Sequence, residues 1–304
     1  MTFDQRKLEA FLAVARSGSL GRATRELPLS QPALSRLIQE LEHRLGDKLF
    51  DRVSRGMILT DFGRTLVPHA SRLLFEMEQT AEALDAVRGL KKGAVRMGAV
   101  ATVARGMLPE AVEALLANAP ELRVSLLEAS APRLFEALAN YEIDLAIAGA
   151  GQFSEHIETM AECVIDSAFR IFCSAEHPLN QEEHIDLAAV LSHAWVMAPP
   201  GSVDRDFFDN AIVEQGLALP RVAVETDSAS SAISFVDRTT LLGWLPRPLF
   251  AGAERAGRFR VLDIPQLVRH ERFFVYRRRH GVLPHAAQHL ISHLPLMVMP
   301  IEGI

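Results

Sequence analysis

Residues 29–46 read LSQPALSRLIQELEHRLG, and this stretch decides the fold of the N-terminal part of the chain. Ser30 is a typical helix N-cap, and Pro32 suits the first turn, where its missing N–H costs nothing. Gly46 is the usual residue just beyond a helix C-terminus. The apolar residues between them recur at helical spacing and form one stripe: Leu34, Leu37, Ile38, Leu41 and Leu45. The stretch therefore predicts a helix with one buried face.

The opposite side of this helix is polar near its start. Gln31, Ser35 and Arg36 fall there, with Gln39 along the same flank. Glutamine can bond adenine and arginine guanine through paired hydrogen bonds in the major groove of DNA. The positive end of the helix at Ser30 also favours a phosphate. Taken alone, the stretch leaves a three-helix bundle with a solvated polar face as an open alternative.

The residues on either side complete a winged helix-turn-helix over 1–60. Upstream, the spacing predicts a helix over 4–17 ended by Gly18, and a short second helix that begins after Ser19 and ends at Pro28. Downstream, segments 49–52 and 57–60 flank a glycine turn and predict a β-hairpin. We expect Arg52 and Arg55 of this wing to lie over the DNA backbone or the adjacent minor groove.

Composition agrees with a two-part soluble protein. The 304 residues exceed one ordinary domain. Residues 1–72 hold 12 Lys and Arg against 8 Asp and Glu, and the rest is acidic, so the basic part is N-terminal. No apolar run is long enough to span a bilayer, and the charged first residues do not resemble a signal peptide, so we expect a cytoplasmic protein. Two cysteines exclude a disulfide framework.

At this point a family resemblance becomes specific. The N-terminal domain closely resembles that of LysR-type transcriptional regulators, departing from the usual pattern at Thr24 and Pro28. The residues that carry the resemblance are 8–15 (LEAFLAVA), Gly18-Ser19-Leu20, 29–36 (LSQPALSR), Leu41-Glu42, Leu45-Gly46, Leu49-Phe50, Arg52, Arg55 and Leu59-Thr60. The resemblance implies a sequence-specific regulator that binds a double-stranded DNA operator and is compatible with contact to RNA polymerase. The predicted DNA-binding residues are Ser30, Gln31, Pro32, Ser35, Arg36, Arg52 and Arg55.

A long linker helix is predicted over 61–89. Apolar residues there alternate by three and four, and a 3.5-residue period is typical of a coiled-coil seam. The predicted dimerisation residues are Leu66, Leu73, Met77 and Leu84, with Ala70 in the same seam. Packing of the helix on its own sensor domain is the alternative. The resemblance implies paired linker helices, in a dimer or a dimer of dimers, that is, a homotetramer.

Residues 90–304 alternate strand and helix and predict an α/β domain of two lobes. Strands at 94–100, 122–128 and 144–148, with helices at 105–118 and 130–140, form a βαβαβ unit of a doubly wound sheet. A second such block follows. We expect lobe I at about 90–163 and 268–304, and lobe II at about 164–267. This arrangement resembles the LysR effector domain, itself similar to periplasmic binding proteins, which implies a small-molecule effector bound between the lobes.

Loops at the ends of these strands are the candidate effector site. The predicted effector-binding residues are Ala101, Thr102, Val103, Ser130, Gly149, Pro200, Gly201, Ser202 and Asp227. Their hydroxyls and helix-start N–H groups suit a carboxylate metabolite, although each hydroxyl is also explained as a helix cap. Several family members have, at the position of Gly149, an arginine that could bind a ligand carboxylate. This chain lacks it there, so the ligand class stays open. Arg105 either replaces that arginine as the cation of the site or points to solvent.

Other functions are disfavoured. A solute-binding protein of the same two-lobed fold would lack the winged helix. An enzyme is not expected, because the chain contains no Gly-x-Ser-x-Gly, P-loop or His-Glu-x-x-His motif, and we expect no metal and no cofactor. We expect the two cysteines, Cys163 and Cys173, to be chemically inert. On the last helix we expect a polar surface stripe formed by His285, His289 and His293. Residues 277–280 are expected to form a solvated turn.

Overall fold

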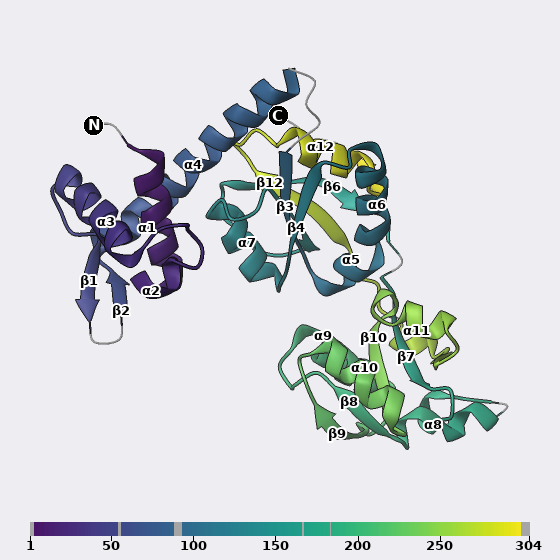
Figure 1. The fold of residues 1–304 in the computed structure, drawn as a ribbon. Helices are drawn as coiled ribbons and strands as arrows, with labels where there is room; N and C mark the ends of the chain where they lie inside the picture. The colour runs from purple at the N-terminus through teal and green to yellow at the C-terminus, as the bar shows by residue number, and fades with distance from the viewer. Residues whose placement is uncertain (1–2, 54–55, 88–92, 166, 183, 299–304) are drawn as a thin grey trace. The chain divides into compact units, whose positions relative to one another are not determined.

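The computed structural model describes residues 3–53, 56–87, 93–165, 167–182 and 184–298. The chain divides into two compact units (Figure 1). The first comprises Met1–Ala99, Ala111–Met160 and Val275–His293, and the second comprises Val100–Glu110, Ala161–Phe274 and Leu294–Ile304. Among the described residues, no helix is both long and apolar enough to cross a membrane.

The first unit begins with the predicted helix-turn-helix. Helix α1 (Gln5–Ser17) ends at Gly18, helix α2 (Leu20–Ala23) follows, and helix α3 (Gln31–Leu45) ends at Gly46. Both glycines adopt a positive φ, of 63° and 83°, which residues with a Cβ rarely adopt. The Ser30 hydroxyl accepts a hydrogen bond from the Ala33 N–H at 3.4 Å, as expected of an N-cap.

The predicted wing is also present. Strands β1 (Phe50–Val53) and β2 (Gly56–Leu59) pair antiparallel and extend away from the three helices (Figure 1). The Met57 N–H donates to the Gly18 carbonyl oxygen at 2.9 Å, so the base of the wing is fixed to the turn after α1. A Cβ at Gly56 would lie 2.3 Å from that same oxygen, which explains why glycine is needed there.

The core of this domain matches the apolar stripe read from the sequence. Its buried residues come from the first three helices, the start of the wing and the following helix: Leu8, Ala10, Phe11, Leu12, Ala13, Val14, Ala23, Leu34, Ile38, Leu41, Leu49, Phe50 and Ala70. Burial of such side chains contributes about 1.5–3 kcal/mol for each large one. The three-helix arrangement is thus held by one continuous apolar cluster.

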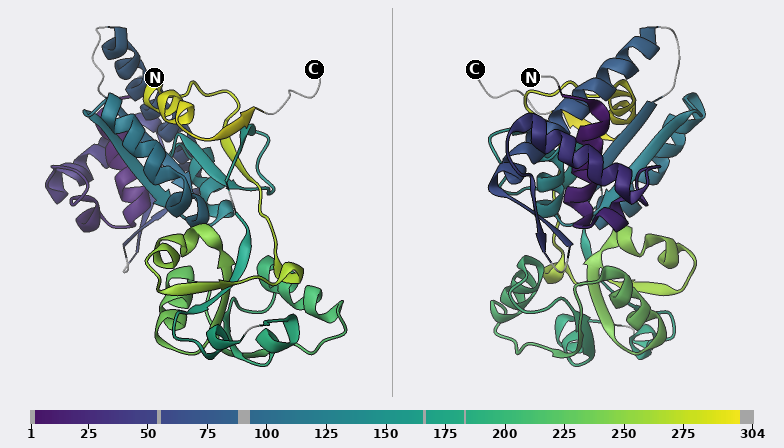
Figure 2. Two further views of the ribbon diagram at one scale, coloured as in Figure 1. Left: turned by 90° about the vertical axis from the view of Figure 1, so that its right-hand side faces the viewer. Right: turned by 60° about the vertical axis from the view of Figure 1, so that its left-hand side comes forward.

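Helix α4 (Asp61–Val87) has two different apolar faces. Ala70 and Phe75 are buried within the first unit, whereas Leu73, Met77 and Leu84 are exposed. Assignment of Ala70 to the exposed seam was therefore wrong, because its side chain belongs to the core of the N-terminal domain. Helix α12 (His285–Ser292) lies alongside α4 (Figure 2).

A six-stranded mixed sheet follows, with strand order β13-β6-β12-β5-β3-β4. Most of it belongs to the first unit, whereas β13, the end of β6 and the start of β12 belong to the second. Strands β3 (Gly93–Ala99), β4 (Leu122–Glu128) and β5 (Leu145–Gly149) are parallel neighbours, as the βαβαβ pattern predicts. The remaining strands are β6 (Ile157–Cys163), β12 (Phe273–Arg278) and β13 (Leu296–Val298), and the helices beside the sheet are α6 (Leu108–Asn118) and α7 (Ala131–Ala139).

The predicted solvated turn at residues 277–280 is wrong for Arg278, which is buried at the end of β12. One terminal nitrogen of its guanidinium donates to the carbonyl oxygens of Leu138 and Ile143, at 2.9 Å and 2.5 Å. The guanidinium carbon lies 4.4 Å from the ring centre of Phe75 and 4.5 Å from that of Tyr141. This arginine therefore joins α4 to the sheet of the first unit.

The second unit contains a five-stranded sheet in the order β11-β7-β10-β8-β9. Its strands are β7 (Phe169–Ser174), β8 (Ala194–Met197), β9 (Arg221–Glu225), β10 (Leu242–Pro246) and β11 (Phe259–Leu262). Strands β8, β9 and β10 are parallel, whereas β7 and β11 are antiparallel to their neighbours. This unit also contains two larger helices, α9 (Val203–Val213) and α10 (Ala229–Arg238). Two shorter helices complete it, α8 (Leu187–Leu191) and α11 (Ala251–Arg255).

The single helix predicted over 105–118 is two helices in the structure. Helix α5 (Ala101–Gly106) belongs to the second unit, Met107 is its C-cap, and α6 begins at Leu108. A Cβ at Gly106 would lie 2.9 Å from the Ile165 side chain and 3.0 Å from Pro248. The break therefore lets α5 pack closely in the second unit.

Candidate DNA-reading face and effector pocket

The N-terminal half of α3 presents the polar face that the sequence predicts. Gln31, Pro32 and Arg36 are exposed, and Ser35 is half-buried. The Arg36 Nε donates to Glu40 at 3.0 Å, which lies one turn further along the helix, and Lys7 of α1 binds the same carboxylate at 2.9 Å. Hydrogen bonds from Lys7 and then from Arg36 hold the pKa of Glu40 below its ordinary value. The Arg36 side chain nevertheless stays 81% exposed and is accessible to a ligand.

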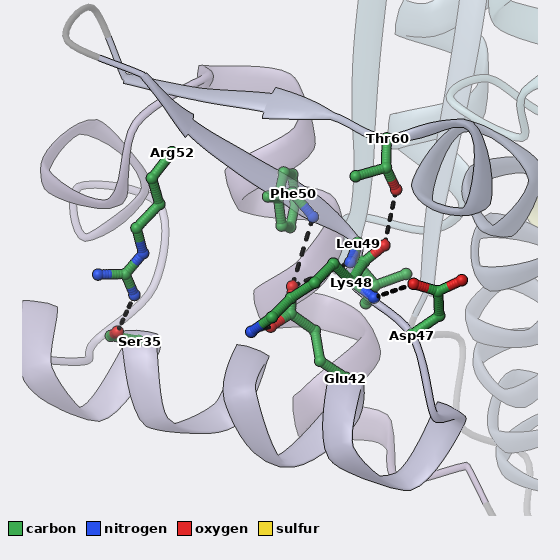
Figure 3. A network of polar contacts seen from close by, with 8 residues as sticks. All are labelled: Ser35, Glu42, Asp47, Lys48, Leu49, Phe50, Arg52 and Thr60. Carbon is green, nitrogen blue, oxygen red and sulfur yellow. Dashed lines mark hydrogen bonds and ion pairs between the residues drawn. The ribbon is translucent and has the colours of Figure 1, made fainter.

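The wing contacts this face directly. A terminal nitrogen of Arg52, on β1, donates to the Ser35 hydroxyl of α3 at 3.1 Å (Figure 3). Two residues predicted to meet DNA are thus neighbours in space although they are 17 positions apart in the chain. Arg55, at the predicted tip of the wing, lies outside the described residues.

Glu42 holds the wing on α3, a role that the sequence did not suggest. Its Oε1 accepts hydrogen bonds from the backbone N–H groups of Leu49 at 2.9 Å and Phe50 at 3.4 Å, and its Oε2 pairs with Lys48 Nζ at 2.9 Å (Figure 3). The carboxylate is nearly fully buried. A buried acid in an amphipathic helix needs such partners, since an unpaired buried charge is costly. The Thr60 hydroxyl adds a bond to the Lys48 carbonyl oxygen at 2.7 Å.

The second unit contains a pocket of about 180 Å³ beside its sheet. Helix α5, the ends of β8 and β10, the segment before α10 and the segment before β12 line it. The lining residues are Thr102, Phe169, Val196, Met197, Ala198, Asp204, Arg205, Thr226, Asp227, Ser228, Ala229, Ala232, Trp244, Leu245, Pro246, Leu249 and Glu271. This volume suits a compact small molecule.

The amino-acid sequence matches two family models that together cover most of the chain. Residues 5–64 match the bacterial regulatory helix-turn-helix protein, lysR family, and residues 88–295 match the LysR substrate binding domain. The chain belongs to the LysR family. It is therefore a DNA-binding transcriptional regulator whose C-terminal domain binds an effector, which confirms the predicted fold class and general function.

Relatives and solved structures agree with this assignment. The LysR-type chain is 35% identical over 229 residues to an uncharacterized HTH-type transcriptional regulator of Escherichia coli, YdcI, spanning 74% of this chain and 73% of the relative. A full-length OxyR variant from Pseudomonas aeruginosa has a similar fold, with 20% identity, 98% of each chain covered and a TM-score of 0.70. Full-length CbnR in complex with its target DNA has 21% identity, 96% and 99% coverage and a TM-score of 0.64.

The pocket of this LysR-type regulator brings together two predicted effector-binding residues, Thr102 and Asp227. Five others belong to the same unit but do not line the pocket: Ala101, Val103, Pro200, Gly201 and Ser202. The Ser202 hydroxyl accepts from the Arg205 N–H at 3.2 Å, which is the helix-capping role left open above. Ser130 and Gly149 belong to the first unit, where the Gly149 carbonyl oxygen accepts a hydrogen bond from the Tyr276 hydroxyl at 3.1 Å.

Several lining residues were not predicted from the sequence. Arg205 is buried, and its Nε donates to both carboxylate oxygens of Asp209, at 2.8 Å and 2.9 Å. The spacing of four residues on α9 was the available signal for this pair. Nothing in the sequence marked Glu271, which precedes β12. Arg105 donates to Ser230 at 2.9 Å and does not line the pocket.

The two cysteines are buried, one in each of the strands β6 and β7. Burial raises the pKa of Cys163 to about 12 and that of Cys173 to about 11. A thiol with so high a pKa is a poor nucleophile at neutral pH.

Proposed function

We propose that α3 and the wing read an operator sequence through Gln31 and Arg36, with Ser30, Pro32, Ser35, Arg52 and Arg55 placing the helix against the DNA backbone. The observation that carries this proposal is the exposed polar start of α3, on a helix whose opposite face packs into the core through Leu34, Ile38 and Leu41. Helices of this kind enter the major groove with their N-terminal residues. Arg36 keeps its guanidinium exposed despite its bond to Glu40, and a paired contact to guanine would replace that bond.

The test is operator discrimination by single variants. An operator is first selected from a random duplex library with the wild-type regulator. Gln31→Ala and Arg36→Ala should then lose discrimination between this operator and a scrambled duplex by about tenfold or more, because each good paired base contact is worth about 1–3 kcal/mol. His43→Ala is the matched control, since His43 is exposed on the C-terminal half of the same helix. Unchanged discrimination in both variants, with unchanged circular dichroism, would refute the assignment.

We further propose that the regulator assembles through the exposed face of α4 into a homodimer or a dimer of dimers. Beside this helix lies a groove of about 660 Å³, lined by Phe3, Leu45, Phe62, Thr65, Leu66, His69, Arg72, Leu73 and Glu76. Leu73, Met77 and Leu84 continue the exposed apolar surface along the helix. A second copy of α4 offers the same apolar stripe, and this self-complementarity supports symmetric pairing.

The proposed effector site is the pocket of the second unit, with Thr102 and Asp227 among its contacts. We propose that the effector is a compact metabolite and that the protein has a regulatory, not a catalytic, role. We also propose that it acts in the cytoplasm and contacts RNA polymerase. The sequence favoured a carboxylate effector. The charges of the pocket favour a different ligand class.

A further inference from the structure

The pocket carries an excess of negative groups. Three carboxylic acids line it, Asp204, Asp227 and Glu271, against one guanidinium, that of Arg205. A carboxylate ligand would have to enter beside these acids. The electrostatic balance of the lining therefore favours a ligand of the opposite charge.

Two arginines here, Arg205 of the lining and Arg269, are already committed to carboxylates. Arg205 binds Asp209 through two hydrogen bonds and also donates to the Ala198 carbonyl oxygen at 3.3 Å. Arg269 pairs with Asp204, and its guanidinium carbon lies 5.2 Å from the ring centre of Phe169. An anionic ligand would have to compete with these ion pairs. The two arginines thus form ion pairs within the protein and are not free to bind an anionic ligand.

Glu271 is a half-buried acid of the pocket, whereas Asp227 is exposed. Its backbone is fixed by Ser167, whose hydroxyl donates to the Glu271 carbonyl oxygen and accepts from its N–H. Its carboxyl group makes no side-chain hydrogen bond or ion pair with any described residue. Desolvation foremost, and then the charge of Asp204, raises the pKa of Glu271, and the charge of Arg269 offsets only part of this rise.

Thr102 supplies a second group without a partner on another wall of the pocket. This residue is only 6% exposed, and its hydroxyl makes no hydrogen bond within the described part of the chain. The residue lines the pocket, so this hydroxyl is available to a ligand there. The ring of Trp244 also lines the pocket, and its indole N–H is used by the Leu267 carbonyl oxygen at 2.7 Å. Its π-face is the part available to a cation.

Resting on the proposed effector role of this pocket, we propose that its ligand carries a protonated amine, bound by the carboxylate of Glu271 and the hydroxyl of Thr102 beside the ring of Trp244. An ammonium group donates three hydrogen bonds and accepts none, which matches two acceptors and an aromatic face. Binding neutralises the half-buried carboxylate and gives the hydroxyl a partner. The chemical class is thus a small primary amine.

The test uses charge-matched probes on the full-length regulator. Benzylamine is compared with benzoate, and 1,4-diaminobutane with succinate, by calorimetry and by the melting temperature read from tryptophan fluorescence. Both tryptophans, Trp195 and Trp244, lie in the second unit, so the fluorescence reports the unit that contains the pocket. We expect the amine of at least one pair to bind and to raise the melting temperature more than its carboxylate counterpart.

Variants locate the binding. Glu271→Gln and Thr102→Val should each weaken amine binding, the former by about tenfold or more because a charge-assisted hydrogen bond is lost. Glu214→Gln is the matched control, since Glu214 is an exposed acid of the same unit that does not line the pocket. Neither pocket variant leaves a new buried charge, so both should fold.

The outcomes separate the ligand class from the site. Carboxylate binding that Thr102→Val weakens would overturn the amine and leave the effector pocket intact. Amine binding that survives in Glu271→Gln would overturn the role of Glu271. If no probe binds in a manner sensitive to Thr102→Val, both the amine and the assignment of this pocket fall.

Discussion

Glu42 offers a quantitative test of how the wing is held. Its Oε1 accepts both backbone hydrogen bonds, from Leu49 and Phe50, while Oε2 faces Lys48. In Glu42→Ala the buried Leu49 N–H loses its acceptor, and the cost of an unsatisfied buried donor is about 1–3 kcal/mol. The longer Phe50 bond adds less. Lys48 is 71% exposed, so its ion pair contributes at most about 1 kcal/mol. We expect Glu42→Ala to lower the free energy of unfolding of the N-terminal domain by about 3 kcal/mol.

Glu42→Gln separates the acceptor from the charge. A glutamine can keep its carbonyl oxygen toward the two backbone N–H groups and turn its amide toward Lys48. It loses the charge of the acceptor, so the expected cost is about 1 kcal/mol. Lys48→Ala should cost less than about 1 kcal/mol, because an exposed ion pair is screened by solvent.

The assay is thermal unfolding followed by two probes. Circular dichroism at 222 nm reports all helices, including those of the N-terminal domain, whereas both tryptophans lie in the second unit. A loss of about 3 kcal/mol should lower the melting temperature of a domain of this size by roughly 12–24 °C. The tryptophan transition should not move, because the hydrogen bonds and the ion pair of Glu42 are made with residues 48–50. A Glu42→Ala protein within about 0.5 kcal/mol of wild type, or a Glu42→Gln protein as unstable as Glu42→Ala, would refute the reasoning.

Three further predictions concern the wing, the assembly and the cysteines. Arg52→Ala should weaken binding to all DNA sequences and reduce the slope of log affinity against log salt by about one unit, measured by fluorescence anisotropy; a loss confined to the operator would contradict this. Leu73→Glu should weaken self-association in sedimentation, because it would bury an unpaired charge, whereas Val213→Glu on the exposed surface of α9 should not; a wild-type monomer at micromolar concentration would exclude the assembly. Cys163 and Cys173 should resist alkylation by iodoacetamide at pH 8 in the folded protein and react in urea, because their raised pKa values keep almost all thiol protonated; mass spectrometry showing rapid labelling of the native protein would contradict this.

Short-range sequence patterns were enough to predict the helices and the buried stripe of the N-terminal domain. Ser30, Gly18 and Gly46 mark helix ends through the backbone geometry that they favour, and the structure places them at those ends. The stripe from Leu34 to Leu41 is buried because a helix repeats its faces every 3.6 residues. These relations act over a few residues, so the sequence alone reveals them.

Long-range contacts were harder to predict. Glu42 and Leu49 are seven residues apart, and the role of this acid depends on where the wing returns to α3. The pocket depends on α5, which the structure places in a different unit from the strand that precedes it. No periodicity reports that change of unit. Glu271 likewise becomes informative only once Thr102 and Trp244 are known to line the same pocket.

Arg278 links the long helix α4 to the sheet of the first unit. Its guanidinium lies between the rings of Phe75 and Tyr141, and burial lowers its pKa to about 10, so it stays charged at neutral pH. A cation held against aromatic rings away from water gains about 2 kcal/mol. Phe75 is therefore fixed to the sheet of the first unit, while Leu73 and Met77, two residues away on either side, are exposed for a partner. An α-helix is rigid over so short a distance, so a displacement of that sheet must move the exposed residues with it. The helix that we propose to join two copies of the regulator is thus also fixed, through Phe75, to the sheet of the first unit.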